Sequence, residues 1–292
     1  MLGIEFVQPA QSVRWPGATA QQPFTSGTVR GRDAHRRIDR EAAAVLPSRH
    51  LGLDYIDIYC LHRDEPDATV GGTVAVLGEV IRGARTRSFG LSNYRDWRIA
   101  QLVNECLAQG VPPPVVCDPY YSLLNRMPDV EMLPACDHFG LGVAPYSPMV
   151  RGVLTGKCKP GGPAPDDSRA AVRDSRLLET EFREESFTIA QTLAQHAAKT
   201  GRTPTQFGLA WLWANRIVSS VIAGPRTLLQ WQDYLAVVGT EWNADDEALV
   251  DSLVKPGHPS TPGYTDPRYP ATGRVTRFWA APRPAIGPTA SS

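Results

Sequence analysis

The chain has no tyrosine before Tyr55 and no lysine before Lys157, and only four of its 292 residues are lysines. Its 30 basic and 30 acidic residues cancel, so no polybasic surface favours nucleic acid or an anionic membrane as a partner. No apolar run is long enough for a membrane-spanning helix, which needs about 18 residues or more. The first ten residues lack the basic segment that begins a signal peptide. We therefore expect a cytoplasmic protein without membrane or nucleic-acid partners.

Cysteine is scarce and irregularly spaced, and no CxxC motif occurs. The five cysteines are Cys60, Cys106, Cys117, Cys136 and Cys158. An odd number at irregular spacing argues against a disulfide framework and against a zinc site, and it fits reduced thiols in the cytoplasm. We expect no bound metal, and the oligomeric state stays open at this stage.

Short apolar runs alternate with amphipathic stretches between residues 51 and 255. The expected strands are 55–61, 87–91, 114–117, 142–145 and 218–223. The expected helices are 69–82, 96–108, 128–139, 184–199 and one that opens with a capping box at Thr203 and Pro204. Strict alternation of strand and helix predicts an α/β fold in which helices cover a parallel sheet. Near the N-terminus LGIEFV is the one strand candidate, and 159–175 is expected to be a long loop.

A histidine and four polar or glycine-containing loops follow the expected strands. His62 comes directly after the strand at 55–61. The loops are FGLSNY at 89–94, DPYYSLLNR at 118–126, GVAPYSPMVRGVLTGK at 142–157 and VIAGPRTLLQWQDYL at 221–235. Side chains at the carboxyl ends of parallel barrel strands carry the chemistry of (β/α)8 enzymes, so we expect these loops to lie on one face of the fold.

With these motifs in this order the chain resembles the aldo-keto reductase family, from about Arg37 to Tyr269. The resemblance implies a (β/α)8 barrel that uses NADP(H) without a GxGxxG motif, and this chain has none. It further implies hydride transfer from the nicotinamide to a small-molecule aldehyde or ketone. In the family a tyrosine is the general acid, assisted by an aspartate, a lysine and a histidine.

The resemblance assigns roles near the reacting centre to four residues. His62 matches the histidine that orients the carbonyl, and a neutral imidazole N–H there would favour developing oxyanion charge. A hydrogen-bonded structural histidine at a strand end is the ordinary alternative. Ser92 and Asn93 match the pair that holds the nicotinamide carboxamide, although the same residues are common helix caps. Tyr146 matches the aromatic that stacks on the nicotinamide, whereas a core tyrosine is the simpler reading.

The remaining assignments concern the rest of the dinucleotide. The residues that match the pyrophosphate loop are Ser147, Met149, Gly152 and Leu154. The residues that match the adenosine side are Gly224, Arg226, Gln230 and Asp233. The planar guanidinium of Arg226 suits a 2′-phosphate and favours NADP over NAD, with a solvated arginine at a helix start as its alternative.

The chain also departs from the family pattern. Asp118 stands where the family has a glutamine, and Tyr234 stands where it has an asparagine. Upstream, Asp33 and Asp39 lack the Tyr-Gly that follows the family's catalytic aspartate, and the catalytic Tyr and Lys have no match. Neither Tyr94 nor Tyr120, the two tyrosines in nearby loops, is expected to replace that acid.

We therefore predict an incomplete (β/α)8-derived barrel of five family units. It comprises a non-matching N-terminal segment at 1–36, a barrel portion at 37–255 and a Pro/Gly-rich tail at 256–292. A mis-set start, a frameshift and a true replacement would each give this N-terminus. The strand at 55–61 is expected to have an open edge that favours self-association. The alternative to a reductase is a non-catalytic nucleotide-binding or interaction protein derived from one.

Overall fold

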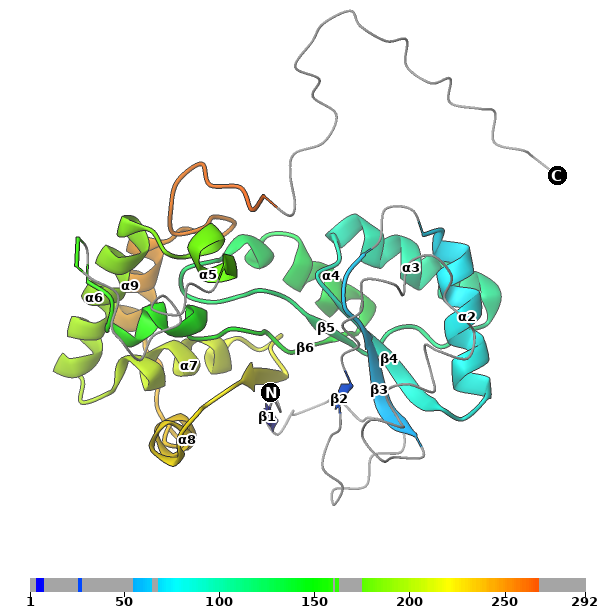
Figure 1. Cartoon of the computed structure of the whole chain (residues 1–292), viewed down its shortest axis with the longest axis horizontal. Helices are drawn as coiled ribbons and strands as arrows, with labels where there is room; N and C mark the ends of the chain where they lie inside the picture. Colours follow the sequence, from blue (N-terminus) through cyan, green and yellow to red (C-terminus); the bar gives the residue numbers. More distant parts are fainter. Residues whose placement is uncertain are drawn as a thin grey trace, which may run out of the picture. The chain divides into compact units, whose positions relative to one another are not determined.

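In a computed structural model of the chain, the described residues are 4–7, 26–27, 55–64, 68–159, 161–162 and 175–267, the first two segments by their backbone only. The chain divides into two compact units, Met1–Pro262 and Gly263–Ser292. The elements below belong to the first unit, and Figure 1 shows them in chain order. The boundaries predicted at 36 and 255 stay predictions.

Parallel strands form the centre of this unit. The main sheet orders β3 (Ile56–Leu61), β4 (Thr86–Ser92), β5 (Val116–Asp118) and β6 (Gly142–Val143), each pair parallel. Parallel bridges Val143–Val218 and Tyr146–Ile222 then join β6 to the strand β7 (Ser220–Ala223). All five strands expected from the sequence are therefore confirmed, and the arrangement is a partial (β/α) barrel.

Two short N-terminal strands flank these five. The strand β1 (Ile4–Val7) pairs antiparallel with β7, and β2 (Ser26–Gly27) pairs parallel with Ile58 and Tyr59 of β3. The edge predicted to be open beside β3 is thus paired over two residues, and Ile56 and Ile58 are buried. The prediction of an open edge was wrong at these two residues. The sequence did not reveal β2, because a two-residue strand is too short to show a hydrophobic period.

Helices follow the strands as expected. The described helices are α2 (Val70–Arg82), α3 (Asp96–Gln109), α4 (Met132–Phe139), α5 (Ser175–Thr180), α6 (Glu184–Lys199), α7 (Pro204–Ala214), α8 (Leu228–Leu235) and α9 (Ala244–Leu253). Two 3-10 helices, η1 (Met127–Asp129) and η2 (Val150–Thr155), complete the set. Thr203 caps α7 in a capping box, as predicted. The single helix expected over 128–139 is instead divided into η1 and α4.

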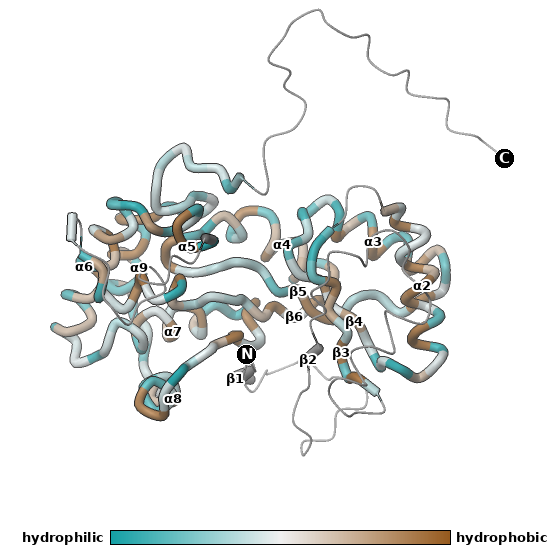
Figure 2. Tube along the Cα trace, viewed as in Figure 1, coloured by the Kyte–Doolittle hydropathy of each residue, from teal (hydrophilic) through white to brown (hydrophobic). Residues whose placement is uncertain are grey.

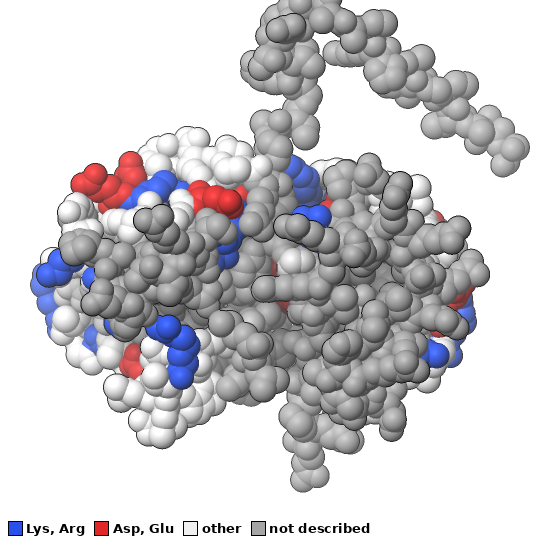
Figure 3. Space-filling model, in the orientation of Figure 1, with Lys and Arg blue, Asp and Glu red and all other residues white. Residues whose placement is uncertain are grey.

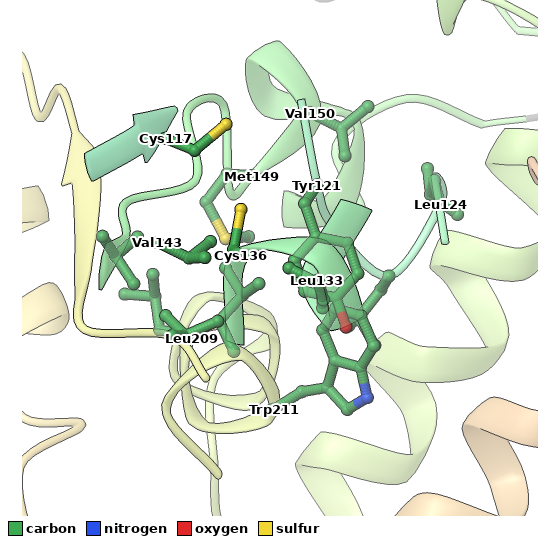
Figure 4. Close-up of a cluster of buried hydrophobic side chains, with 14 of the residues drawn as sticks. Cys117, Tyr121, Leu124, Leu133, Cys136, Val143, Met149, Val150, Leu209 and Trp211 are labelled. Carbon is green, nitrogen blue, oxygen red and sulfur yellow. The ribbon is translucent and has the colours of Figure 1, made fainter. Parts of the chain in front are cut away.

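The core lies between the sheet and these helices. Figure 4 shows its centre, where the rings of Tyr121 and Trp211 pack 4.9 Å apart beside Leu133. Gly90 in the middle of β4 has no room for a side chain, since a Cβ there would lie 2.5 Å from Val116 and 2.8 Å from Cys60. That close approach keeps β3, β4 and β5 in register, and so keeps their carboxyl ends together.

One helix packs only loosely on this core. None of the residues of α8 is buried, although the half-buried Tyr234 packs against the core, and Leu228 and Leu229 are 70% and 76% exposed. In Figure 2 part of the tube of α8 has the colour of hydrophobic residues. Its hydrogen bonds to other elements therefore do more to place it than apolar packing does.

Candidate functional site

The predicted site residues of the first four strands gather at the carboxyl end of the sheet. His62 follows β3 and Ser92 ends β4. Asp118 ends β5, and Tyr146 follows β6 closely enough to form a bridge with β7. The placement expected for these loops is confirmed, while the ligand roles assigned to them stay predictions.

Asn93 is the centre of a hydrogen-bond network at this edge. Its Nδ2 donates to the backbone oxygen of His62 and to Oγ of Ser92, both at 2.8 Å. Its Oδ1 accepts a 2.7 Å bond from the hydroxyl of Tyr146. The backbone of Asn93 is left-handed, with φ at 57°, a conformation that asparagine tolerates better than most residues. One amide side chain thus links the ends of β3, β4 and β6.

Ser92 adds β5 to the same network. Its side chain is buried, and its Oγ donates to the backbone oxygen of Asp118 at 3.2 Å. Neither Ser92 nor Asn93 caps α3, because the N-cap of that helix is Arg95 and makes no side-chain capping bond. The helix-cap explanation for this pair is therefore wrong, and the two side chains are turned toward the sheet edge.

Tyr146 is half-buried against a second tyrosine. Its ring centre lies 5.6 Å from that of Tyr120, with the planes tilted by 32°. Its backbone N–H donates to the oxygen of Pro119 at 3.0 Å. Both ends of the side chain are therefore fixed, which makes its ring a firm wall for a planar ligand.

The turn after Tyr146 has an unusual backbone. Ser147, Val150 and Arg151 are left-handed with φ between 51° and 57°, and Gly152 follows at 101°. Non-glycine residues in this region cost energy and persist only where surrounding contacts hold them. The side chains of Met149 and Leu154 are buried in the core, the former visible in Figure 4, and anchor this turn to it.

A buried charged cluster lies behind the turn, and sequence reasoning missed it. Nη1 of Arg151 lies 2.8 Å from Oε2 of Glu181, and the guanidinium sits 5.9 Å from the ring centre of Tyr120. The Tyr120 hydroxyl and Oε1 of Glu181 are buried without a hydrogen-bond partner among the described residues. Burial, and then the charge of Glu181, raise the pKa of Tyr120 well above its ordinary value.

The loop that carries His62 is anchored from α3. His62 is exposed, and two residues further on Asp64 binds Nε of Arg98 at 3.0 Å. The same guanidinium donates to the backbone oxygen of Ala68 at 2.8 Å. Arg98 therefore spans the connection between β3 and α2.

The adenosine-side residues lie at the start of α8. Gly224 and Arg226 are exposed, and the N–H of Arg226 donates to Oε1 of Gln230 at 2.7 Å. Oδ1 of Asp233 accepts 2.9 Å bonds from Oγ1 of Thr203 and Nε2 of Gln206. Gln230 thus shapes the Arg226 loop, and Asp233 ties α8 to the beginning of α7. These contacts take up one side-chain oxygen of Gln230 and one of Asp233.

A model of the aldo/keto reductase family matches residues 27–255, starting upstream of Arg37. The chain belongs to this family. The aldo/keto reductase match covers the strands β3 to β7 and every residue of the candidate site.

Relatives in the family carry different names. An aldo-keto reductase of Fusarium vanettenii is 28% identical over 70% of this chain and 54% of its own length. The L-glyceraldehyde 3-phosphate reductase of Escherichia coli O157:H7 is 26% identical over 72% of this chain and 61% of its own. A putative voltage-gated potassium channel subunit beta of Schizosaccharomyces pombe is 28% identical over 71% and 59%. This chain therefore spans somewhat more than half the length of these aldo/keto reductase relatives.

Two further observations bound the chemistry of the part of the chain that the structure describes. No helix in it has the length and apolarity that crossing a bilayer requires. Across the same residues, no three His, Cys, Asp or Glu side chains come together in a way that could hold a metal ion.

Proposed function

We propose that this aldo/keto reductase binds NADP(H) at the carboxyl end of its sheet and serves the reduction of an aldehyde or ketone. The observation that carries the proposal is the network in which Asn93 joins His62, Ser92 and Tyr146. It brings together, from the ends of three strands, the groups that the family resemblance assigns to the nicotinamide and to the substrate carbonyl.

The residues present fit a dinucleotide. A Cβ at Gly152 or at Gly224 would meet no atom within 4 Å, so both backbones are open to an approaching ligand. Tyr146 offers a fixed ring for the nicotinamide, and the exposed guanidinium of Arg226 offers charge-assisted bonds for a 2′-phosphate. Bound there, NADPH would supply the hydride for a carbonyl carbon.

In the reaction, the chain's own residues would orient the substrate and the nucleotide. His62 is exposed at the end of β3, and its imidazole N–H would donate to the carbonyl oxygen of the substrate. Asn93 holds the backbone of His62 in place at the same time. Arg226 would anchor the far end of the nucleotide.

The second candidate is a non-catalytic nucleotide-binding or interaction protein. It is favoured by the absence of any tyrosine or lysine before Tyr55, where the family carries its acid and its lysine. Loss of a general acid removes roughly a hundredfold to ten-thousandfold in rate. Under this alternative the site would hold NADPH without passing its hydride on at an enzymatic rate.

Two measurements on the full chain test these proposals. Quenching or enhancement of NADPH fluorescence measures binding, and the decrease in NADPH absorbance with a generic aldehyde measures turnover. Binding with turnover near background supports the second candidate, and turnover near 1 s⁻¹, an ordinary enzyme rate, supports the reductase. A chain that binds neither NADPH nor NADH overturns the reductase and the nucleotide-binding form of the second candidate.

We also place the protein in a reducing compartment such as the cytoplasm. All five cysteines are buried, and none of them forms a disulfide. Thiols kept in this form fit the cytoplasmic expectation.

Acidic and basic side chains are mixed on the described surface visible in Figure 3, which supports a small molecule rather than a nucleic acid as the ligand.

A further inference from the structure

The Arg151–Glu181 ion pair joins the turn after Tyr146 to the segment that follows α5. The two side chains are only 13% and 4% exposed, and Nη1 of Arg151 also donates to Oγ1 of Thr180 at 3.4 Å. Taking two charges out of water costs more than an isolated pair generally returns in stability. Fold stability alone therefore gives no reason for an ion pair at this place.

The conformation of the turn supplies a reason. Val150 and Arg151 are successive left-handed residues without the freedom of glycine. Such a backbone needs contacts that hold it, and the side chain of Arg151 is fixed by Glu181 from 30 positions away. The ion pair is thus the side-chain anchor of a strained turn.

The same ion pair is connected to the wall of the site through Arg151. The guanidinium of Arg151 lies 5.9 Å from the ring centre of Tyr120, and that ring packs 5.6 Å from the ring of Tyr146. The charge of Glu181 also contributes to the raised pKa of Tyr120. Arg151 therefore connects Glu181 both to the left-handed turn and to the pair of tyrosine rings.

We propose that Glu181 is a positioning residue of the nucleotide site. Through Arg151 it holds residues 147–152 in the left-handed form, and through Tyr120 it supports Tyr146. It does not touch the ligand, because its oxygens are buried behind these two side chains. This inference rests on the proposed NADP(H) site.

The test compares binding with folding in the full-length chain. Glu181→Leu combined with Arg151→Met replaces the pair by apolar side chains, an exchange that buried ion pairs commonly tolerate. We expect the double variant to keep the thermal midpoint of the wild type and to bind NADPH roughly tenfold or more weakly, since the turn is free to relax. The single variant Glu181→Gln retains an oxygen for Arg151, so it is expected to keep most of the wild-type affinity for NADPH.

A matched control uses an arginine–carboxylate pair elsewhere. Arg216 and Asp137 form a bidentate pair that is 76% and 43% exposed, and Arg216→Ala is expected to leave NADPH binding unchanged. A double variant that binds NADPH as tightly as the wild type overturns the role of Glu181. If the double variant does not fold, Glu181→Gln combined with Arg151→Gln replaces it, since this exchange leaves no buried charge, and unchanged affinity there overturns the role equally. A wild-type chain that does not bind NADPH at all refutes the proposed function instead.

Discussion

The hydroxyl of Tyr146 donates to Oδ1 of Asn93 at 2.7 Å, across 53 positions of sequence. The bond joins the loop after β6 to the loop after β4, and Asn93 extends it to His62. The position of the exposed histidine therefore depends on a side chain that is itself held by the proposed nicotinamide wall. Removing Asn93 is expected to loosen three loops together.

Asn93 allows the hydrogen bonds to be separated from the backbone conformation. Asn93→Gly and Asn93→Ala both remove the amide, but glycine accepts φ near 57° freely and alanine does not. We expect both variants to be destabilised, and the free energy of unfolding of Asn93→Ala to be lower than that of Asn93→Gly by about 1 kcal/mol. Urea unfolding measures the difference. An alanine variant as stable as the glycine variant would contradict a strained left-handed residue at this position.

Arg226 is expected to set the choice between the two nicotinamide dinucleotides. A charge-assisted contact with the 2′-phosphate gives NADPH a preference of about tenfold to a hundredfold over NADH. Arg226→Ala should reduce this preference for NADPH over NADH, mainly by weakening the binding of NADPH. Fluorescence titrations of both nucleotides measure it, with Arg216→Ala as the exposed control. Equal affinities in the wild type, unchanged by the substitution, would remove Arg226 from the site.

Arg98 is expected to stabilise the loop of His62. Arg98→Ala leaves Asp64 and the oxygen of Ala68 without their partner in a part-buried place, at a cost of about 1–3 kcal/mol. Arg98→Lys keeps the charge but not the fork that reaches both groups, so it should recover only part of this loss. Chemical unfolding together with proteolysis near residue 64 reports the effect. Proteolysis as slow as in the wild type would show that the loop is held by other contacts.

Acid is expected to destabilise the protein through Asp246. Burial alone would raise the pKa of this carboxyl, but hydrogen bonds from Arg202 and His196 bring its pKa below the ordinary value of 3.8. Because the folded-state pKa is the lower one, this stabilisation is present above pH 3.8 and is lost as the pH falls through the folded pKa.

Asp246→Asn tests the role of this carboxyl. The substitution should lower stability at pH 7 by about 3 kcal/mol, since Arg202 loses its buried partner, and it should flatten the acid limb of the stability curve. Asp245→Asn, an exposed neighbour on the same helix, serves as the control. An unchanged acid limb in Asp246→Asn would assign the acid sensitivity to other carboxyls.

Regular elements were predictable from the sequence because their signal is local. The helix at 184–199 and the capping box at Thr203 appear at the residues where the sequence predicts them. The strand β2 escaped prediction because two residues carry no alternation. The boundary at β6 came earlier than expected, since regular pairing ends at Val143 and only an isolated bridge continues at Tyr146.

The site was predictable only where motifs mark it. The Ser92–Asn93 pair and Tyr146 were singled out by loop motifs, whereas the bond between them follows from the parallel pairing of β4, β5 and β6. Glu181 stands next to a long loop and has no motif of its own. Its pairing with Arg151 depends on packing between segments 30 residues apart, which no local pattern records.

The lack of buried residues in α8 bears on how this family diversifies. This helix contributes only the half-buried Tyr234 to packing against the core, so most of its positions can change without endangering the fold, as long as its tether at Asp233 and its cap at Thr227 remain. The residues that select the nucleotide would then lie on a surface helix that contributes little to the stability of the fold. The five-stranded framework could stay fixed while lineages exchange one dinucleotide for the other.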